Sequence, residues 1–227
     1  MKFALLYAGP YRGTNEILDN HIKVFGSNID IYVSCFEHYL DDWKNSGWPV
    51  KEYFITPNID FKSTNWYKYR NDEAGQAGFW QFWNLKNLID NVPRLYDFYI
   101  KSRNDIIFNK TFEFDSSILK RKTIYSGAES FHKKEWDISL WINDEFYMAC
   151  DYTMLVISKF VTDFYNSENR HSLNAATASN ESQLRIHLKE NNIIVEKIYE
   201  FLYQKNHYGV TQPSGYVKFQ LENIQND

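Results

Sequence analysis

The fold follows most directly from residues 2–36, which read KFALLYAGPYRGTNEILDNHIKVFGSNIDIYVSCF. Lys2–Ala8 is an apolar run followed by Gly9-Pro10, the pattern of a buried strand that ends in a tight turn. Ile29–Phe36 is a second apolar run, and Thr14–Phe25 between them places apolar residues at helical spacing. A β-α-β unit of this kind builds a parallel sheet that is covered by helices.

Further elements follow from the same patterns along the chain. Together they predict an α/β fold with one mixed, mostly parallel sheet flanked by helices. The predicted strands are Glu52–Ile55, Tyr96–Phe108 with charged residues inside it, Thr123–Ser126, Phe146–Ala149 and Ile193–Ile198, and the predicted helices are Phe79–Val92, Tyr152–Tyr165 and Glu181–Glu190.

The length of 227 residues favours one main domain, which we place at 1–220, with 221–227 as a frayed tail. Pro57–Gly78 is polar and aromatic with few periodic apolar positions, so we expect a long mobile loop that closes over a site. The stretch 166–180 is rich in Asn, Ser and Ala and is the second expected mobile loop.

Composition excludes some functional classes. The formal net charge of −4 argues against nucleic acid as a partner, because affinity for nucleic acid rests on Lys and Arg. No run approaches the roughly 20 apolar residues that span a bilayer, and the first residues lack the pattern of a full signal peptide. We therefore expect no transmembrane segment and a cytoplasmic protein, in which Cys35 and Cys150 stay reduced; a peripheral position at a membrane fits too.

Asp105 is the most informative candidate site residue. It interrupts two apolar runs, Tyr96–Ile100 and Ile106–Phe108, so it must lie near a strand end or be strongly desolvated. Ligands of open parallel sheets bind beyond the carboxyl ends of the strands, where a carboxylate can hold a divalent ion. Arg103 would point to the same side as Asp105 in an extended chain. A purely structural Arg103–Asp105 ion pair explains the local pattern equally well.

The first turn offers a second candidate. Gly9 lets the backbone approach a ligand closely, and the guanidinium of Arg12 suits a phosphate. The turn lacks the Gly-x4-Gly-Lys-Ser/Thr pattern of a nucleotide-binding P-loop. A surface turn with a solvated Arg12 is the alternative.

A third candidate is a group of carboxylates around the strand Phe146–Ala149. Asp144 and Glu145 precede this strand, and Asp151 follows it. One of them would serve as the base that accepts a proton from an attacking hydroxyl. Acidic residues are also common in ordinary turns.

The order of these segments resembles the WavE-like lipopolysaccharide and capsule synthesis glycosyltransferases, a family with a GT-A-like fold. The similarity extends from Lys2 to Ile198. The segments that carry it are FALLYAGPYR, IDIYVSCFEHY, GFWQFWNLKNLI, YDFYIKSRNDIIF, Asn143–Phe146 with the following Asp151 and Met154, and ESQLRIHLKENNIIVEKI.

The resemblance implies a sugar transfer from a nucleotide-sugar donor to a glycan or lipid-linked acceptor in surface polysaccharide or glycoconjugate synthesis. Gly9 and Arg12 would line the nucleotide pocket, Arg103 and Asp105 would lie at the diphosphate, and Asp144 and Glu145 would face the acceptor. GT-A enzymes usually hold Mn²⁺ or Mg²⁺ with an Asp-x-Asp motif. Here Asp105 is the expected metal ligand, but Arg103 stands in place of the first Asp.

Two other functions remain open from the sequence. A nucleotidyltransferase also uses an α/β sheet with carboxylates at strand ends, although a two-metal displacement needs more than one acidic ligand. A non-enzymatic carbohydrate-binding module is suggested by the aromatic stretch Trp66-Tyr67-Lys68-Tyr69, although core packing explains most of the 17 Tyr, 17 Phe and 7 Trp.

Overall fold

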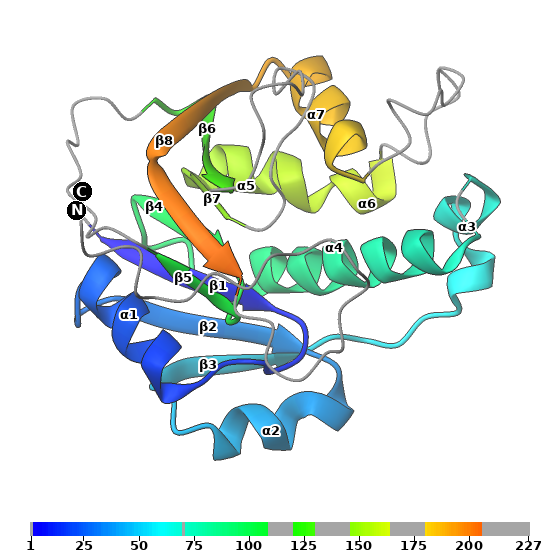
Figure 1. Ribbon diagram of the computed structural model, residues 1–227. Coiled ribbons are helices and arrows are strands. Elements are labelled where there is room, and N and C mark those ends of the chain that lie inside the picture. The colour runs from blue at the N-terminus through cyan, green and yellow to red at the C-terminus, as the bar shows by residue number, and fades with distance from the viewer. Residues whose placement is uncertain (1, 70, 109–119, 130–145, 164–179, 206–227) are drawn as a thin grey trace.

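The computed structural model describes residues 2–69, 71–108, 120–129, 146–163 and 180–205 (Figure 1). The strands are β1 (Phe3–Ala8), β2 (Asp30–Cys35), β3 (Val50–Ile55), β4 (Phe98–Ser102), β5 (Ile106–Phe108), β6 (Thr123–Glu129), β7 (Tyr147–Ala149) and β8 (Ile194–Lys205). The helices are α1 (Asn15–Phe25), α2 (Leu40–Asn45), α3 (Asn65–Tyr69), α4 (Glu73–Asn91), α5 (Asp151–Ser158), α6 (Phe160–Asp163) and α7 (Asn180–Glu190), with short 3₁₀ turns η1 (Glu37–Tyr39) and η2 (Phe61–Ser63).

The predicted β-α-β unit is confirmed by β1, α1 and β2. Thr14 caps α1, since its Oγ1 accepts a hydrogen bond from the amide of Ile17 at 3.3 Å. Gly26, with φ of 92°, ends the helix, as glycine commonly does. β1 and β2 then pair in parallel along their length. Their carboxyl ends therefore lie together at one edge of the sheet.

The described strands form one sheet in the order β3-β2-β1-β4-β7-β6-β8-β5. β3, β2, β1 and β4 are parallel, β7 is antiparallel to both β4 and β6, and β8 is parallel to β6. Edge strand β5 runs antiparallel to β8. This confirms the predicted α/β architecture, a mixed and mostly parallel sheet flanked by helices.

Two apolar cores cover the two faces of the sheet (Figure 1). One includes buried residues of α4, α5, α6 and α7, with Leu85, Leu88 and Phe160 among them. The other includes residues of α1, α2 and β5, with Ile17 and Trp43 among them. Because both faces are covered, the strands are apolar along their length, which explains the uninterrupted apolar runs of β1 and β2.

The prediction of one continuous strand over Tyr96–Phe108 was wrong. The chain turns at Asn104 and Asp105, so β4 ends at Ser102 and β5 lies at the far edge of the sheet. β5 contacts α1, where the side-chain amide of Asn20 donates to the carbonyl of Phe108 at 2.8 Å and accepts from its amide at 2.9 Å. Arg103 and Asp105 thus lie in a turn between two strands, whereas the sequence analysis placed them inside one extended strand.

The prediction of a long loop over Pro57–Gly78 was also wrong for most of its length. This segment contains η2, α3 and the first turns of α4. Asp72 caps α4 by accepting from the amide of Gly75 at 2.8 Å, and Trp66 is 1% exposed in the core. The apolar pattern missed these elements because Gly75 and Gly78 interrupt the helical periodicity. Whether the segment closes over a ligand stays a prediction.

In the second half of the chain, β6, β7, α7 and β8 confirm four predicted elements within one residue at their first residues. The helix expected from Tyr152 is split into α5 and α6. The stretch 166–179, the tail 221–227 and the domain end at 220 lie outside the described residues, so these predictions stay untested. Cys35 and Cys150 are both free.

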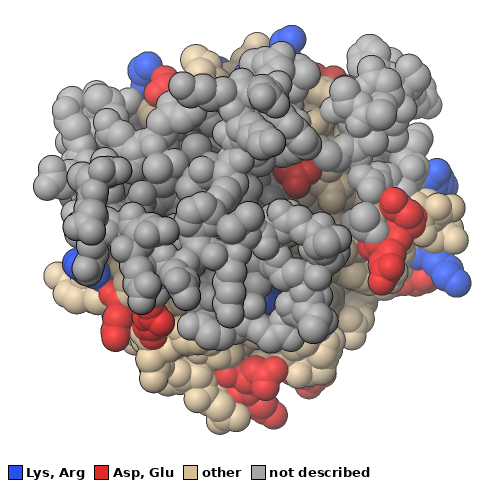
Figure 2. Space-filling view, viewed as in Figure 1, with Lys and Arg blue, Asp and Glu red and all other residues tan. Residues whose placement is uncertain are grey.

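Within the described residues, no helix is long and apolar enough to cross a membrane. In Figure 2, acidic side chains gather at the lower edge of the molecule, in the region where Figure 1 places α2. Asp41 and Asp42 of this helix are exposed. The Lys and Arg side chains visible among the described residues on this face are dispersed.

Candidate functional site

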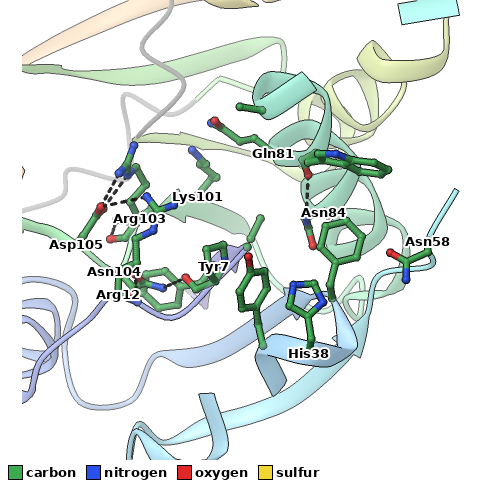
Figure 3. Close-up of a pocket in the computed structure, with 18 residues that line it drawn as sticks. Tyr7, Arg12, His38, Asn58, Gln81, Asn84, Lys101, Arg103, Asn104 and Asp105 are labelled. Carbon is green, nitrogen blue, oxygen red and sulfur yellow. Dashed lines mark hydrogen bonds and ion pairs between the residues drawn. The ribbon is translucent and has the colours of Figure 1, made fainter. Parts of the chain in front are cut away.

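A cleft of about 660 Å³ opens at the carboxyl ends of β1, β2, β3 and β4, with one side of α4 as a wall. Figure 3 shows basic side chains at one end of it and His38, Asn58 and Asn84 at the other. The lining residues are Tyr7, Ala8, Gly9, Pro10, Arg12, Phe36, His38, Tyr39, Asn58, Ala77, Trp80, Gln81, Asn84, Lys101, Ser102, Arg103, Asn104 and Asp105.

Gly9 begins the turn that follows β1 into the cleft. Its φ is 109°, a region in which only glycine is comfortable. Its amide donates to the carbonyl of Ser34 at 2.8 Å, and its carbonyl accepts from Nε1 of Trp43 at 2.9 Å. Both backbone groups of Gly9 are thus held by neighbouring elements, and the turn has a fixed position at the edge of the sheet.

The side chain of Asn104 joins the turn at Gly9–Arg12 to the turn between β4 and β5 by hydrogen bonds. Its Oδ1 accepts from the amide of Arg12 at 3.0 Å, and its Nδ2 donates to the carbonyl of Pro10 at 3.0 Å. The residue is 6% exposed. Sequence reasoning missed Asn104 as a site residue; the available signal was a turn-forming Asn between the two charged residues Arg103 and Asp105.

Asp105 lies between two guanidinium groups. Arg103 donates to both of its oxygens, from Nε at 2.7 Å and from Nη2 at 2.5 Å, and Nη1 of Arg12 is 3.9 Å away. The Asp105 side chain is 6% exposed, whereas those of Arg103 and Arg12 are 27% and 59% exposed. The carboxylate therefore fixes the position of Arg103 while both guanidinium-bearing side chains still reach solvent.

Lys101 adds a third basic group to the same end of the cleft. It is 2% exposed, and its Nζ lies 5.6 Å from the ring centre of Tyr147. A cation over an aromatic face at this distance is stabilised by the ring quadrupole. Strand β4 thus contributes Lys101, and the turn after it contributes Arg103.

His21 is a buried residue of α1 that holds the start of β5, just after the turn at Asn104 and Asp105. Its Nε2 donates to the carbonyl of Ile106 at 2.8 Å, so its Nδ1 accepts from the hydroxyl of Tyr7. Burial lowers the pKa of His21 to about 4, opposed by the Ile106 hydrogen bond and the charge of Asp105. Burial also raises the pKa of Tyr7. Both side chains are therefore neutral near pH 7, and they join α1 to β1 and β5 without adding charge.

The other end of the cleft is lined by aromatic rings and amides. Phe36 meets Trp80 edge to face, with ring centres 5.3 Å apart. Asn84 accepts from the hydroxyl of Thr56 at 2.7 Å and is 3% exposed. Thr56 is in turn bonded to the hydroxyl of Ser34 at 2.8 Å. This buried network joins α4 to β2 and to the residue after β3, so the aromatic wall has a fixed distance from the strand ends.

Four of the predicted site residues, Gly9, Arg12, Arg103 and Asp105, line this one cleft. The sheet brings them together from two turns that are far apart in the chain; Arg12 and its partner Asn104 are 92 residues apart.

Of the predicted carboxylates around β7, only Asp151 lies within the described residues. Asp144 and Glu145 lie outside the described residues, so their placement stays a prediction. Asp151 does not line the cleft; it begins α5 and pairs with Arg94 at 2.8 Å.

The described residues do not fit the divalent ion that we expected at Asp105. Both oxygens of Asp105 already accept hydrogen bonds from the guanidinium of Arg103, and Arg12 adds a second positive charge nearby, so a divalent ion there would lie beside two cations. Within the part of the chain that the structure describes, no group of three or more His, Cys, Asp or Glu side chains could hold a metal ion. The chemistry of this corner suits an anion.

Comparison with known proteins gives distant structural likenesses only. No family model matches the chain, and no curated protein matches its sequence. The catalytic domain of Drosophila β1,4-galactosyltransferase 7, in complex with xylobiose, is 11% identical over all of this chain and 80% of its own, with a TM-score of 0.46.

Two further solved structures are similar to the same degree. The galactosyltransferase LgtC, in complex with donor and acceptor sugar analogues, is 8% identical over 85% of this chain and 72% of its own, with a TM-score of 0.46. The 4-diphosphocytidyl-2C-methyl-D-erythritol synthase of Anaerococcus prevotii DSM 20548 is 10% identical over 99% of this chain and 92% of its own, with a TM-score of 0.48. Likenesses this distant do not assign an activity or a family to the chain.

Proposed function

We propose that this protein is a glycosyltransferase that moves a sugar from a nucleotide-sugar donor to a glycan or lipid-linked acceptor. The observation that supports this most is the two-part character of the cleft. Arg12, Lys101 and Arg103 stand at one end, and the aromatic pair Phe36 and Trp80 stands at the other. A nucleotide-sugar has the matching parts, a charged diphosphate beside a flat base and a sugar ring.

The cationic end would bind the diphosphate. Guanidinium groups recognise phosphate oxygens through paired, charge-assisted hydrogen bonds. The leaving nucleoside diphosphate gains negative charge as its bond to the sugar breaks, so fixed positive groups stabilise the transition state more than the ground state. Gly9 would let the backbone approach the donor, and Asn104 would hold the Gly9–Arg12 turn in place.

The aromatic end would take the base or a sugar ring. Trp80 and Phe36 offer apolar surface, and Asn58, Gln81 and Asn84 offer amide groups at the same wall. The side chain of Asn84 accepts a hydrogen bond from the hydroxyl of Thr56 and donates one to the carbonyl of Trp80, both at 2.7 Å. Its orientation is therefore fixed before a ligand binds. Preorganised polar groups among aromatic rings are what small-ligand sites use for specificity.

The acceptor side and the base come from the resemblance to the WavE-like family. By that resemblance Asp144 and Glu145 would face the acceptor, and Asp144 is the residue we favour as the base in a reaction with inversion. The same resemblance is the reason to propose a role in the synthesis of surface polysaccharide or another glycoconjugate, in the cytoplasm.

The proposed function is tested by incubating the protein with UDP-, GDP- and CMP-sugars and measuring the released nucleotide by chromatography, with and without added glycan acceptors. Release that increases with an acceptor supports sugar transfer. Release of pyrophosphate from a nucleoside triphosphate and a sugar phosphate would instead identify a nucleotidyltransferase. Thermal stabilisation by free sugars, with none by any nucleotide, would identify a carbohydrate-binding module.

A further inference from the structure

We infer that the cleft binds the diphosphate of a nucleoside diphosphate without a divalent cation, through Arg12, Lys101 and Arg103. This inference rests on the proposed function, because it concerns the donor of the same site. Side-chain cations from two turns and one strand take the place of the metal.

Asp105 is already committed to Arg103. Its side chain is 6% exposed, and both of its oxygens accept hydrogen bonds from Arg103, at 2.7 and 2.5 Å. A metal ion at Asp105 would have to displace the bidentate guanidinium or share the buried carboxylate with it, and either arrangement leaves a cation beside a cation. Bidentate Arg–carboxylate pairs are among the strongest side-chain contacts. In this structure Asp105 positions Arg103.

The charges of the described lining residues also suit an anion. They are Arg12, Lys101, Arg103 and Asp105, three positive and one negative. Three of these four charged side chains are cations, which suits the negative charge of a diphosphate. A divalent ion would add two more positive charges at the same end of the cleft, and repulsion between like charges in a partly buried site is costly.

Asn104 sets the geometry of the cationic end. It joins the turn that carries Arg12 to the turn that carries Arg103, through hydrogen bonds of 3.0 Å to Arg12 and to Pro10. The two guanidinium groups therefore face the same carboxylate from separate turns, as Figure 3 shows. Arg12 is 59% exposed and can turn towards a ligand, while Arg103 is held by Asp105. A fixed cation beside an adjustable one is suited to enclosing two phosphates.

The test is calorimetric titration of UDP and GDP, and of UMP and GMP as controls with a single phosphate, into the metal-stripped protein. One series contains excess EDTA and the other contains Mn²⁺. For whichever of UDP and GDP binds more tightly, we expect the affinities measured in EDTA and in Mn²⁺ to agree within about threefold, a difference in binding free energy below about 1 kcal/mol. We also expect that diphosphate to bind more tightly than its monophosphate.

The matched variants are Arg12→Gln and Lys23→Gln. Lys23 is exposed near the end of α1 and does not line the cleft. In EDTA, Arg12→Gln should lower the affinity for the diphosphate at least about tenfold, the equivalent of one charge-assisted hydrogen bond. Lys23→Gln should leave this affinity unchanged. Because Arg12 is mostly exposed, its replacement leaves the core intact.

Binding of a diphosphate only with Mn²⁺ would overturn the inference and leave the proposed function standing. Unchanged affinity in Arg12→Gln would overturn it as well. Failure of all four nucleotides to bind in both series would overturn the inference and would also refute a UDP- or GDP-sugar as the donor in the proposed function.

Discussion

The two ends of the parallel strands each carry a cleft and an ion-paired aspartate, but the two differ in burial and in charge. At the carboxyl end, the Asp105 side chain is 6% exposed and is flanked by Arg103 and Arg12. At the amino end, a cleft of about 700 Å³ contains Asp30, which is 37% exposed and pairs with the 53% exposed Lys51 at 2.7 Å. The clefts are of similar size, so volume does not separate them.

The difference lies in the surroundings of each aspartate. Partial burial acts to raise the pKa of Asp30, but hydrogen bonds from Lys51 and Tyr96 hold it below its usual value. Exposed pairs of this kind contribute little to stability. Asp105 is instead enclosed, and the described residues around it carry more positive than negative charge. A buried carboxylate that organises several cations indicates a site for an anion, whereas Asp30 indicates a solvated surface pair.

The largest effect should come from Asp105→Asn. It removes the charge that fixes Arg103, so we expect sugar transfer to fall at least about 100-fold, with a raised KM for the donor, because small displacements in a site are costly. The measurement is steady-state kinetics, with circular dichroism to check the fold. The matched variant Asp30→Asn should keep activity within about twofold, since exposed pairs are worth little. Equal losses in both variants would erase the distinction between the two ends.

Asp144→Asn tests whether the carboxyl end also has a base. It should lower kcat by about 100-fold, the usual effect of losing a general base, with little change in donor affinity. Glu145→Gln should do much less. The anomeric configuration of the product, determined by NMR, is the decisive control: a retained configuration would remove the need for this base.

His21, below the cleft, should make stability depend on pH. Its pKa is about 4 in the folded protein and about 6.5 in the unfolded chain, so the unfolded state binds more protons between these values. Stability is therefore lost as pH falls through this window, by about 2 kcal/mol between pH 7 and pH 5. The measurement is urea unfolding at both pH values.

The control for this pH dependence is His21→Gln, which cannot titrate but can still donate to the carbonyl of Ile106. Burial also lowers the pKa of His187, so this residue too makes stability fall as pH falls. The part of the pH dependence that comes from His187 should persist in His21→Gln. A pH dependence identical to that of the unmodified protein would show that His21 is not the cause.

Asn104→Ala should have the smallest effect of the four. It removes two hydrogen bonds that join the cationic turns, each worth about 1 kcal/mol in net stability. We expect a KM for the donor that is raised several-fold with kcat little changed, because the turn still forms but is less well held. Asn28→Ala, at an exposed position in the cleft of the amino end, is the matched control and should change neither constant.

Much of the carboxyl end was predictable from local pattern. Apolar runs that stop at Gly9-Pro10 and near Asp105 mark strand ends, and parallel strands bring those ends together. The resemblance to the WavE-like family implied that Gly9, Arg12, Arg103 and Asp105 share a site, and the structure places all four in one cleft. The architecture of the sheet was predictable for a related reason, since strands buried on both faces are continuously apolar.

The parts that were missed depend on contacts between distant residues. No local pattern shows that Ile106–Phe108 leaves β4 for the other edge of the sheet, because its pairing with β8 and its bonds to Asn20 form only in the folded chain. Trp66 likewise resembles a loop aromatic in sequence, yet it is buried against α4 and α6. Asn104 was missed because its two partners lie in the first turn.

Nucleotide binding at the carboxyl end of the sheet, and not at the amino end, is the central claim. Hydrogen–deuterium exchange followed by mass spectrometry, with and without saturating UDP or GDP, tests it directly. We expect slower exchange in peptides that cover residues 9–13 and 101–106, with no change in those that cover residues 26–30 and 94–97. Protection confined to the amino-end peptides, or no protection at residues 9–13 and 101–106 when the nucleotide is bound, would contradict the claim.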